Sequence, residues 1–399
     1  MTDKDSTPHA PRPTPHAPRS TPFDPGLLVA VLLALFAIVP LLAHPGLPNT
    51  ADGPAHLMRQ AELNQAWQDG TLYPRWAPDL AYGYGMPLFN YAPPLLYQVT
   101  QILHLTGLPL DAAMKGTIIL MLVLYSLGMY LFVRDLFGPR AGLLAAAVYL
   151  YAPYRLREAY IQGNYGQFCG LAFYPLILWS FHGLVTTNRR RYLPLAALSL
   201  TGLLLSHNIS AMLLAPLLGV YLVFLLGLRG GGSRGIGGSG TQGLRDQGIR
   251  ESGDRGMEDS GTQGIGDSGN REARSPDFPS PDSLSPDSLS PARPLPRTLA
   301  AILLGLGLSA FFWLPAFGER DLIRLSGITR DFFDFRLNFI SLAELLALPR
   351  PLDLSAINPY YPLSLGLAQI TFAVLAMMEL GLYFVLRNAR RVRIAKYPQ

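Results

Sequence analysis

The segment from Asn49 to Arg59 brings together an aspartate, a histidine and an arginine directly after an apolar run. Asp52 falls just beyond that run, near the depth of lipid phosphates, so its carboxylate can act as a base toward a lipid-borne substrate. His56 follows four residues later and shares a helix face with Asp52, and Arg59 is a further candidate substrate-binding residue. Pro54 suits a first helical turn, so a second interpretation is that Asp52 only caps this helix.

Several basic side chains have the chemistry to neutralise a phosphate group. Arg155 and Arg157, followed by Glu158, lie apart from the basic clusters described below, and arginine forks match phosphate oxygens. The alternative is a surface ion pair of either arginine with Glu158. Lys115, near a span end, is a second phosphate candidate or a snorkelling lysine, and Arg75 is a third candidate.

Residues 70–94 are crowded with aromatic, Pro and Gly residues, Tyr82 among them. Such a segment suits a platform at the headgroup level on which a sugar or a prenyl chain packs, although an aromatic belt without a ligand explains it equally well. The sequence Gly83-x-Gly85 lacks a preceding strand and a following helix, which argues against a nucleotide loop.

Two further polar groups lie beside apolar runs. Ser206, His207 and Asn208 form a turn between two of them, and because no nucleophile elbow surrounds the Ser-His pair, a turn that closes the site is favoured over a hydrolase. Glu319 and Arg320 follow another apolar run and either face the site or form an exposed ion pair.

The composition is that of a membrane protein. Of 399 residues, 49% are hydrophobic and only 15% are charged, which excludes an ordinary soluble enzyme. The one cysteine, Cys169, excludes an internal disulfide framework and a Cys-rich zinc site. Although the net charge is +5, the Lys and Arg residues flank apolar runs and form no single basic face, so nucleic acid is not expected as a partner.

Apolar runs predict an all-α polytopic membrane protein with about eight transmembrane helices, most of them long enough to approach the ~30 Å hydrocarbon core. The first run lacks a good cleavage site after it, so an uncleaved anchor is favoured over a signal peptide. The stretch 88–108 is broken by Pro93 and Pro94, and is expected to be an amphipathic or re-entrant helix. The predicted spans are 26–43, 113–133, 139–153, 168–187, 192–206, 209–228, 298–316 and 362–386.

An eight-span topology places every strong basic cluster on one side, which is expected to be the cytoplasm. These clusters are Arg134 with Arg140, the triplet 189–191 and the C-terminal tail. The predicted domains are a disordered tail (1–25), a membrane bundle (26–228) with an extracytoplasmic loop (45–112), a disordered low-complexity cytoplasmic linker (229–297), a second membrane segment (298–387) with an extracytoplasmic loop (317–361), and a basic cytoplasmic tail (388–399).

Several short motifs in this order resemble a bacterial membrane family labelled "6-pyruvoyl-tetrahydropterin synthase-related", which is similar to the C-type glycosyltransferases (GT-C). The resemblance covers roughly 28–228 and 300–387. In that family an Arg-Gly pair and a nearby Glu follow the Pro-Tyr-Arg motif, whereas this chain has Gln162-Gly163 and Gln167 there. The motifs are Asp52-x-x-x-His56, Leu72 to Trp76, Gly83 to Phe89, Ala152 to Arg155, Ser206 to Asn208 and Trp313 to Pro315.

The resemblance implies an inverting glycosyltransferase in the plasma membrane that uses a polyprenyl-phosphate sugar at the extracytoplasmic face. Asp52 would be the catalytic base, and Arg75, Lys115 or Arg155 would neutralise the departing phosphate. The acceptor would be a glycan, a lipid or a protein, and no metal or other cofactor is indicated. The substrate-binding candidates are His56, Arg59, Arg75, Tyr82, Lys115, Arg155, Glu158, Gln162, His207, Asn208, Glu319 and Arg320.

Two alternatives stay open. One is a catalytically degenerate membrane scaffold, which the two glutamines and the short chain favour. The other is a transporter of lipid-linked saccharides, which predicts polar residues near the midplane of the spans and an internal repeat. Pterin synthase chemistry is rejected because it requires a three-histidine zinc site, and the histidines outside the N-terminal tail are scattered singly.

Overall fold

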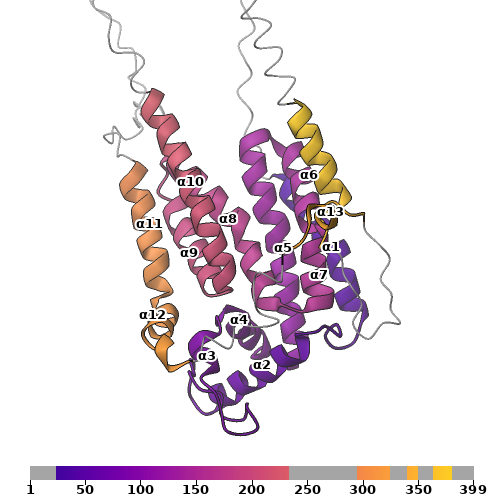
Figure 1. The fold of residues 1–399 in the computed structure, drawn as a ribbon, viewed down its shortest axis with the longest axis vertical. Helices are drawn as coiled ribbons and strands as arrows, with labels where there is room; N and C mark the ends of the chain where they lie inside the picture. Colours follow the sequence, from indigo (N-terminus) through magenta and orange to yellow (C-terminus); the bar gives the residue numbers. More distant parts are fainter. Residues whose placement is uncertain (1–23, 233–293, 324–338, 349–362, 380–399) are drawn as a thin grey trace, which may run out of the picture.

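The computed structural model describes residues 24–232, 294–323, 339–348 and 363–379, and in these ranges the chain is helical with no strand. Figure 1 shows the long helices side by side, with α2, α3 and α4 gathered at one end of them. The helices are α1 (Pro25–Ala43), α2 (Gly53–Gln68), α3 (Leu88–Tyr91), α4 (Leu95–His104), α5 (Leu110–Phe137), α6 (Pro139–Leu150), α7 (Pro153–Arg157), η1 (Glu158–Gln162), α8 (Tyr165–Thr187), α9 (Tyr192–Leu204), α10 (Asn208–Gly232), α11 (Pro294–Leu308), α12 (Ala310–Gly318), η3 (Arg320–Leu322) and α13 (Leu342–Leu345), with a further helix at Leu367–Glu379.

Every predicted span coincides at least in part with a described helix, but the helices differ in length. Four of them, α1, α5, α8 and α10, are long and apolar enough to cross a membrane. The pair α11 and α12 passes the same test together, which gives up to five spans. Helices α6, α9 and Leu367–Glu379 are apolar but shorter. The structure therefore supports an all-helical membrane protein, while the count of eight spans stays a prediction.

Helix α1 shows how one face enters the bundle while the other remains apolar and exposed. Ala30, Ala34 and Leu41 are buried at helical spacing, and Ser126 of α5 donates a hydrogen bond of 2.7 Å to the Ala30 carbonyl. On the opposite face Phe36 is 75% exposed, and leucines and valines surround it. A face of this composition is stable next to lipid, because lipid tails impose no cost on apolar side chains.

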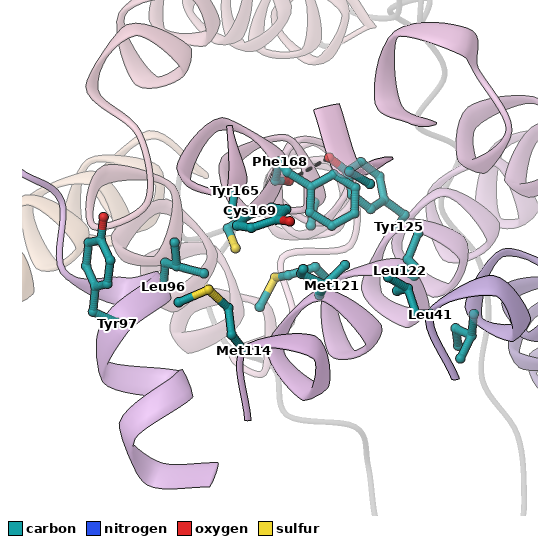
Figure 2. Close-up of a cluster of buried hydrophobic side chains, with 14 of the residues drawn as sticks. Leu41, Leu96, Tyr97, Met114, Met121, Leu122, Tyr125, Tyr165, Phe168 and Cys169 are labelled. Carbon is teal, nitrogen blue, oxygen red and sulfur yellow. Dashed lines mark hydrogen bonds between the residues drawn. The ribbon is translucent and has the colours of Figure 1, made fainter. Parts of the chain in front are cut away.

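The main core lies between α4, α5 and α8. Figure 2 shows Met114 and Met121 of α5 facing Cys169 of α8, and Tyr125 reaching the same helix. The Tyr125 hydroxyl donates a hydrogen bond of 2.6 Å to the carbonyl of Phe168. This bond satisfies a polar group that is fully buried, so α5 and α8 are held in register where they face each other.

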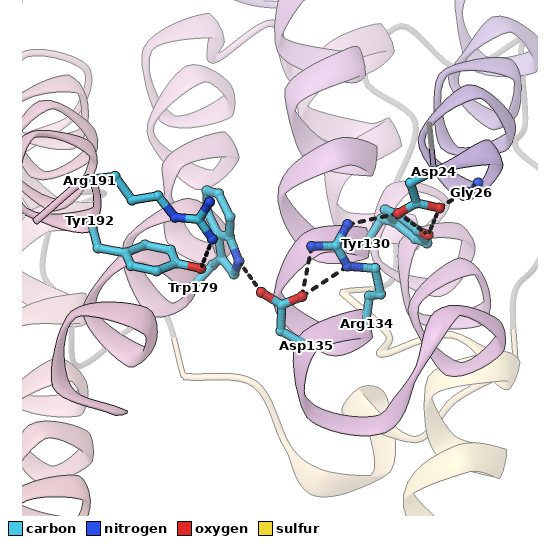
Figure 3. Close-up of polar contacts among 8 residues, drawn as sticks. All are labelled: Asp24, Gly26, Tyr130, Arg134, Asp135, Trp179, Arg191 and Tyr192. Atoms are coloured by element: carbon cyan, nitrogen blue, oxygen red, sulfur yellow. Dashed lines mark hydrogen bonds and ion pairs between the residues drawn. The ribbon is translucent and has the colours of Figure 1, made fainter. Parts of the chain in front are cut away.

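Polar contacts at the opposite end of the bundle from α2 to α4 tie α1, α5 and α8 together (Figure 3). Asp24 caps α1 through the Gly26 N–H, and its carboxylate also accepts from Tyr130 and Arg134 at the end of α5. Asp135 accepts from the indole of Trp179 on α8. The predicted basic clusters around Arg134 and the 189–191 triplet thus lie at one end, as the topology requires.

The stretch predicted to be an amphipathic or re-entrant helix is two short helices, α3 and α4, separated at Pro93 and Pro94. Pro94 precedes the first residue of α4, because its ring fits a helix start but not a helix interior. One face of α4 is buried, with Tyr97, Thr100 and Gln101 directed toward α2 and α5, while Ile102 is 57% exposed.

The segment predicted as the span 298–316 consists of two helices, since α11 and α12 meet at an angle of 67°. Ser309 lies at the break and its hydroxyl bonds back to the Gly305 carbonyl, a local bond that competes with the helical pattern. At the predicted linker 229–297, α10 continues to Gly232 and α11 begins at Pro294. The rest of that linker, like both chain ends, lies outside the described residues.

Candidate functional site

Asp52 is positioned by backbone hydrogen bonds to a segment more than a hundred residues away. The N–H of Ala51 donates to the Ile161 carbonyl (3.0 Å), and the N–H of Asp52 donates to the Gln162 carbonyl (2.8 Å). Gly163 makes this approach possible: it has a φ of +72°, and a Cβ there would collide with the Thr50 hydroxyl. The turn after η1 and the turn before α2 are therefore built against each other.

The interpretation of Asp52 as only a helix cap is wrong. Asp52 stands at the N-cap position of α2, but its side chain makes no capping bond. The hydroxyl of Thr50 accepts the Gly53 N–H instead, at 3.0 Å, and Pro54 lies in the first turn as predicted. The Asp52 carboxylate is thus available for other contacts.

The carboxylate of Asp52 contacts Gln162, one of the two glutamines singled out in the sequence. Gln162 Nε2 donates to Asp52 Oδ2 at 3.1 Å, and Gln162 Oε1 accepts from Arg157 at 3.4 Å. Gln167 donates to the Tyr154 hydroxyl at 2.8 Å. Gln162 therefore bridges an acid and a guanidinium by neutral hydrogen bonds, where an arginine would carry a full charge beside Asp52.

Glu158 is the buried acid of the site. It is 1% exposed, and its Oε1 pairs with Arg157 at 3.0 Å. The predicted ion pair therefore forms with Arg157, but it is buried on the Glu158 side and not at the surface as expected. Among the described residues, Oε2 is buried without a hydrogen-bond partner. Burial raises the pKa of Glu158 to about 7, with Asp52 adding to the rise and Arg157 opposing it. Glu158 can therefore hold or release a proton near neutral pH.

Arg155 does not share the Glu158 pair. Its guanidinium lies over the ring of Tyr149, 3.4 Å from the centroid, and 5.5 Å from that of Tyr125. Its Nε is buried without a hydrogen-bond partner among the described residues. Aromatic rings stabilise the cation but leave this donor unused, so Arg155 retains the capacity to bind an anion.

His56 and Arg59 meet at one hydroxyl, that of Tyr97. His56 Nδ1 lies 2.8 Å from the Tyr97 oxygen, and Arg59 donates to the same oxygen at 3.4 Å. The His56 ring also packs against Tyr165, with centroids 5.4 Å apart. Burial, followed by the Arg59 charge, lowers the pKa of His56 to about 4. The imidazole is thus neutral at pH 7.

Lys115 is engaged with helix α1. Its ammonium donates to the carbonyls of Leu41, at 2.9 Å, and of His44. These carbonyls end α1 without intrahelical partners, and a cation is favoured there by the helix dipole. Lys115 is therefore neither a simple snorkelling lysine nor a free phosphate ligand in this structure.

Arg75 and Glu319 form a second group. Arg75 pairs with the Glu319 carboxylate and donates to Asn90 Oδ1 at 2.7 Å, and Asn90 donates in turn to Glu319 at 2.9 Å. Tyr91 donates to the Glu319 backbone carbonyl. This group joins α3 to the end of α12, so the first loop is tied to the segment that follows the linker.

The predicted pairing of Glu319 with Arg320 is wrong, because Glu319 turns toward Arg75 while Arg320 lies 3.7 Å from Asp321 in the solvent-exposed η3. In the described part of the chain, no hydrogen bond or ion pair links Arg75 to Asp52 or Arg155. Some of the predicted candidates thus form an Asp52 group and an Arg75 group, whereas Lys115, Arg155 and Arg320 make their contacts outside both.

The turn at His207 lies against the start of α8 and of α4. His207 Nδ1 contacts the Ser210 hydroxyl at 2.8 Å, and the N–H of Leu95 donates to the Leu205 carbonyl. Asn208 begins α10 and is exposed. Tyr82 is fully exposed in the loop between α2 and α3, with a φ of +60°. Neither His207, Asn208 nor Tyr82 contacts Asp52 among the described residues.

Sequence reasoning missed Thr50, Tyr97, Asn90 and Tyr165. Tyr97 could have been found from the sequence, because it lies on the apolar face of α4 and carries a hydroxyl group. The other three have no signal in the sequence, because their roles depend on contacts between distant segments. Among the described residues, no three His, Cys, Asp or Glu side chains are close enough to hold a metal ion.

The helices and exposed apolar faces define the class of this chain as an all-α membrane protein. Residues 89–231 match the model of a family described as "6-pyruvoyl-tetrahydropterin synthase related domain; membrane protein". These residues are therefore similar to that membrane family, and the resemblance predicted from the motifs is confirmed over them. No curated protein matches the chain.

Proposed function

We propose that this protein is a GT-C-like glycosyltransferase of the plasma membrane, which transfers a sugar from a polyprenyl-phosphate donor at the extracytoplasmic face. Asp52 is the general base in this proposal. The charge bias of the sequence assigns the end that carries α2, α3 and α4 to that face. The bilayer supplies the donor laterally, and a glycan, a lipid or a protein is the acceptor.

The observation that carries the proposal is the environment of the Asp52 carboxylate. Oδ2 is oriented by Gln162, while Oδ1 makes no hydrogen bond within the described residues. The side chain is half-buried, and it lies in the segment that follows the apolar helix α1. An oriented carboxylate with one free oxygen is what proton abstraction from an acceptor hydroxyl requires.

Two arginines of α7 supply the positive charge that a departing lipid phosphate needs, and Gln162 connects one of them, Arg157, to Asp52. Arg155 has an unused buried donor, and Arg157 is shared between Glu158 and Gln162. These two residues suit the role better than Arg75 or Lys115, which are committed to Glu319 and to helix carbonyls. Preformed cations of this kind stabilise charge as it develops in the transition state.

In the proposed reaction, Asp52 accepts the proton of the acceptor hydroxyl as its oxygen attacks the anomeric carbon. The bond from that carbon to the phosphate oxygen breaks, and the lipid phosphate leaves with the bonding electron pair. Attack from the face opposite the phosphate inverts the configuration. Glu158, with a pKa of about 7, is placed to exchange a proton with the site.

The experiment is incubation of the reconstituted protein with a panel of polyprenyl-phosphate sugars and candidate acceptors, scored by release of lipid phosphate. Asp52→Asn is expected to lower release by about 100-fold or more, the usual contribution of a general base. Asp321→Asn is the matched control, since Asp321 is an exposed carboxylate with a side chain 92% accessible. Equal release by Asp52→Asn and the native protein would refute the assignment.

A second candidate, a catalytically degenerate lipid-binding scaffold, is favoured by the contact of Gln162 with Asp52. In this case the native protein binds the lipid-linked sugar without releasing the phosphate. The double variant Gln162→Arg with Gln167→Glu restores the family's residues, and a gain of release in this variant alone would select the second candidate.

A further inference from the structure

The loop between α2 and α3 forms the tip of the molecule, beyond the short helices and away from the long ones (Figure 1). It exposes Trp76 by 53% and Tyr84 by 87%, besides the fully exposed Tyr82. The loop lies beyond the ends of the long helices α5 and α8 (Figure 1), so its exposed rings are open to a ligand in the aqueous phase.

Trp76 is held as a rigid platform. Ala77 and Met86 exchange two backbone hydrogen bonds, of 2.9 and 3.0 Å, immediately after it. Gly85, with a φ of +73°, lies against the indole, and a Cβ there would collide with Trp76 Nε1. The glycine thus lets the ring lie on the backbone, and the remainder of the indole stays open. An anchor fixed before binding loses little conformational entropy on binding.

Two pockets meet at this ring, both lined by Trp76 and Arg75, and together they are called the Trp76 groove. The first, of about 320 Å³, is also lined by polar residues of α2 that recur at helical spacing, namely Glu62, Gln65 and Asp69. The second, of about 480 Å³, extends past Asn90 to Glu319. Both volumes lie in the range of small-molecule sites.

The chemistry of the groove selects a neutral, hydroxyl-rich ligand. An indole face packs against apolar C–H surface, while the carboxylates of Glu62 and Asp69 accept hydrogen bonds from hydroxyl groups. The amide of Gln65 both donates and accepts. The charge of Arg75, which also lines the groove, is compensated by its pair with Glu319. The carboxylates of Glu62 and Asp69 repel phosphates and other anions, which argues against a nucleotide or a lipid phosphate.

The groove is distant from Asp52. Asp52 precedes α2, whereas the lining residues are on its second half, from Glu62 to Asp69. At a rise of about 1.5 Å per residue, they lie roughly 15 to 25 Å from Asp52 along the helix axis. A ligand that occupies the groove while its end reaches Asp52 must therefore be an extended chain.

We infer that the Trp76 groove binds a neutral oligosaccharide as the distal part of the acceptor. This inference rests on the proposed function for the role of the ligand as acceptor, and on the groove alone for the binding itself. It narrows the acceptor from a glycan, a lipid or a protein to a glycan chain long enough to span the length of α2.

The test is calorimetric titration of the full chain in nanodiscs with neutral gluco-, galacto-, manno- and N-acetylglucosamine oligosaccharides of different lengths. One series is expected to bind, with longer members binding more tightly. Trp76→Ala is expected to weaken binding by about tenfold or more, and Trp76→Phe by less. Gln65→Ala and Gln68→Ala form a matched pair on α2: Gln65 lines the groove and its loss is expected to weaken binding, whereas Gln68 does not line it and serves as the control.

Absence of binding by every series, or equal binding by Trp76→Ala and the native protein, overturns the inference. Weaker association of Trp76→Ala with empty lipid vesicles would instead assign the loop to the membrane surface and also overturn it. The titration measures binding without turnover, so it separates the two proposals. A saccharide that binds but accepts no sugar refutes the proposed function and supports the groove as a binding site. Transfer of sugar to a lipid or a protein, with no saccharide bound, supports the proposed function and refutes the inference about the groove.

Discussion

Glu158 and His56 are predicted to give the native protein opposite pH dependences of stability that nearly cancel. The pKa of Glu158 rises from 4.5 in the unfolded chain to about 7, since burial disfavours its charged form. At ~1.36 kcal/mol per pH unit, its contribution to the free energy of unfolding changes by about 3 kcal/mol. That contribution is present below pH 4.5 and is lost as the pH rises to 7.

His56 has the opposite sign. Its pKa falls from 6.5 to about 4, because burial disfavours the imidazolium. Its contribution is present above pH 6.5 and is lost as the pH falls toward 4, again by about 3 kcal/mol. Between pH 4.5 and 6.5 the two slopes oppose each other, so the native protein is expected to show a nearly flat profile from this pair.

Single variants separate the two slopes. Glu158→Gln removes the titrating acid with little change of shape, so stability is expected to rise from pH 4.5 to 6.5 relative to the native protein. His56→Gln is expected to make stability fall over the same range. The readout is the apparent unfolding midpoint in detergent, where ~2 °C per kcal/mol gives a relative change of about 5 °C.

The control is Asp321→Asn, which removes an exposed carboxylate outside the site and is expected to follow the native profile. Parallel profiles for Glu158→Gln and the native protein would show that Glu158 is not a buried acid, and its assigned role in proton exchange would be withdrawn.

Three further changes test how the site and the bundle are held together. Asp24→Ala removes the α1 cap and the acceptor shared by two donors of α5, Tyr130 and Arg134. The free energy of unfolding is therefore expected to fall by about 1 to 2 kcal/mol, which is read from the unfolding midpoint. Gly163→Ala places a Cβ against Thr50 at a positive φ, so the free energy of unfolding is expected to fall by more than ~1 kcal/mol and the release of lipid phosphate to decrease. Unchanged release would show that the Asp52 turn tolerates displacement. Glu319→Ala breaks a half-exposed pair with Arg75, so the free energy of unfolding is expected to change by less than ~1 kcal/mol. Because the pair ties the first loop to the end of α12, proteolysis after α12 is expected to become faster.

Much of the helical framework follows from the sequence. Long apolar runs predict α1, α5, α8 and α10 closely, since a helix that faces lipid must satisfy its backbone internally and keep an apolar surface. The position of Asp52 at the end of the first run follows in the same way. The bend at Ser309 does not, because the competition between its hydroxyl and the helix is decided by the neighbouring packing.

The partners of the candidate site were decided by tertiary structure. The sequence predicted Arg75, Lys115 and Arg155 as equivalent phosphate ligands, but their surroundings differ: a carboxylate, two helix carbonyls and two aromatic rings. It also could not show that Gln162 meets Asp52 across 110 residues. Local patterns fix helices because helical hydrogen bonds are local, whereas the charge and protonation of a site depend on which distant groups exclude water from it.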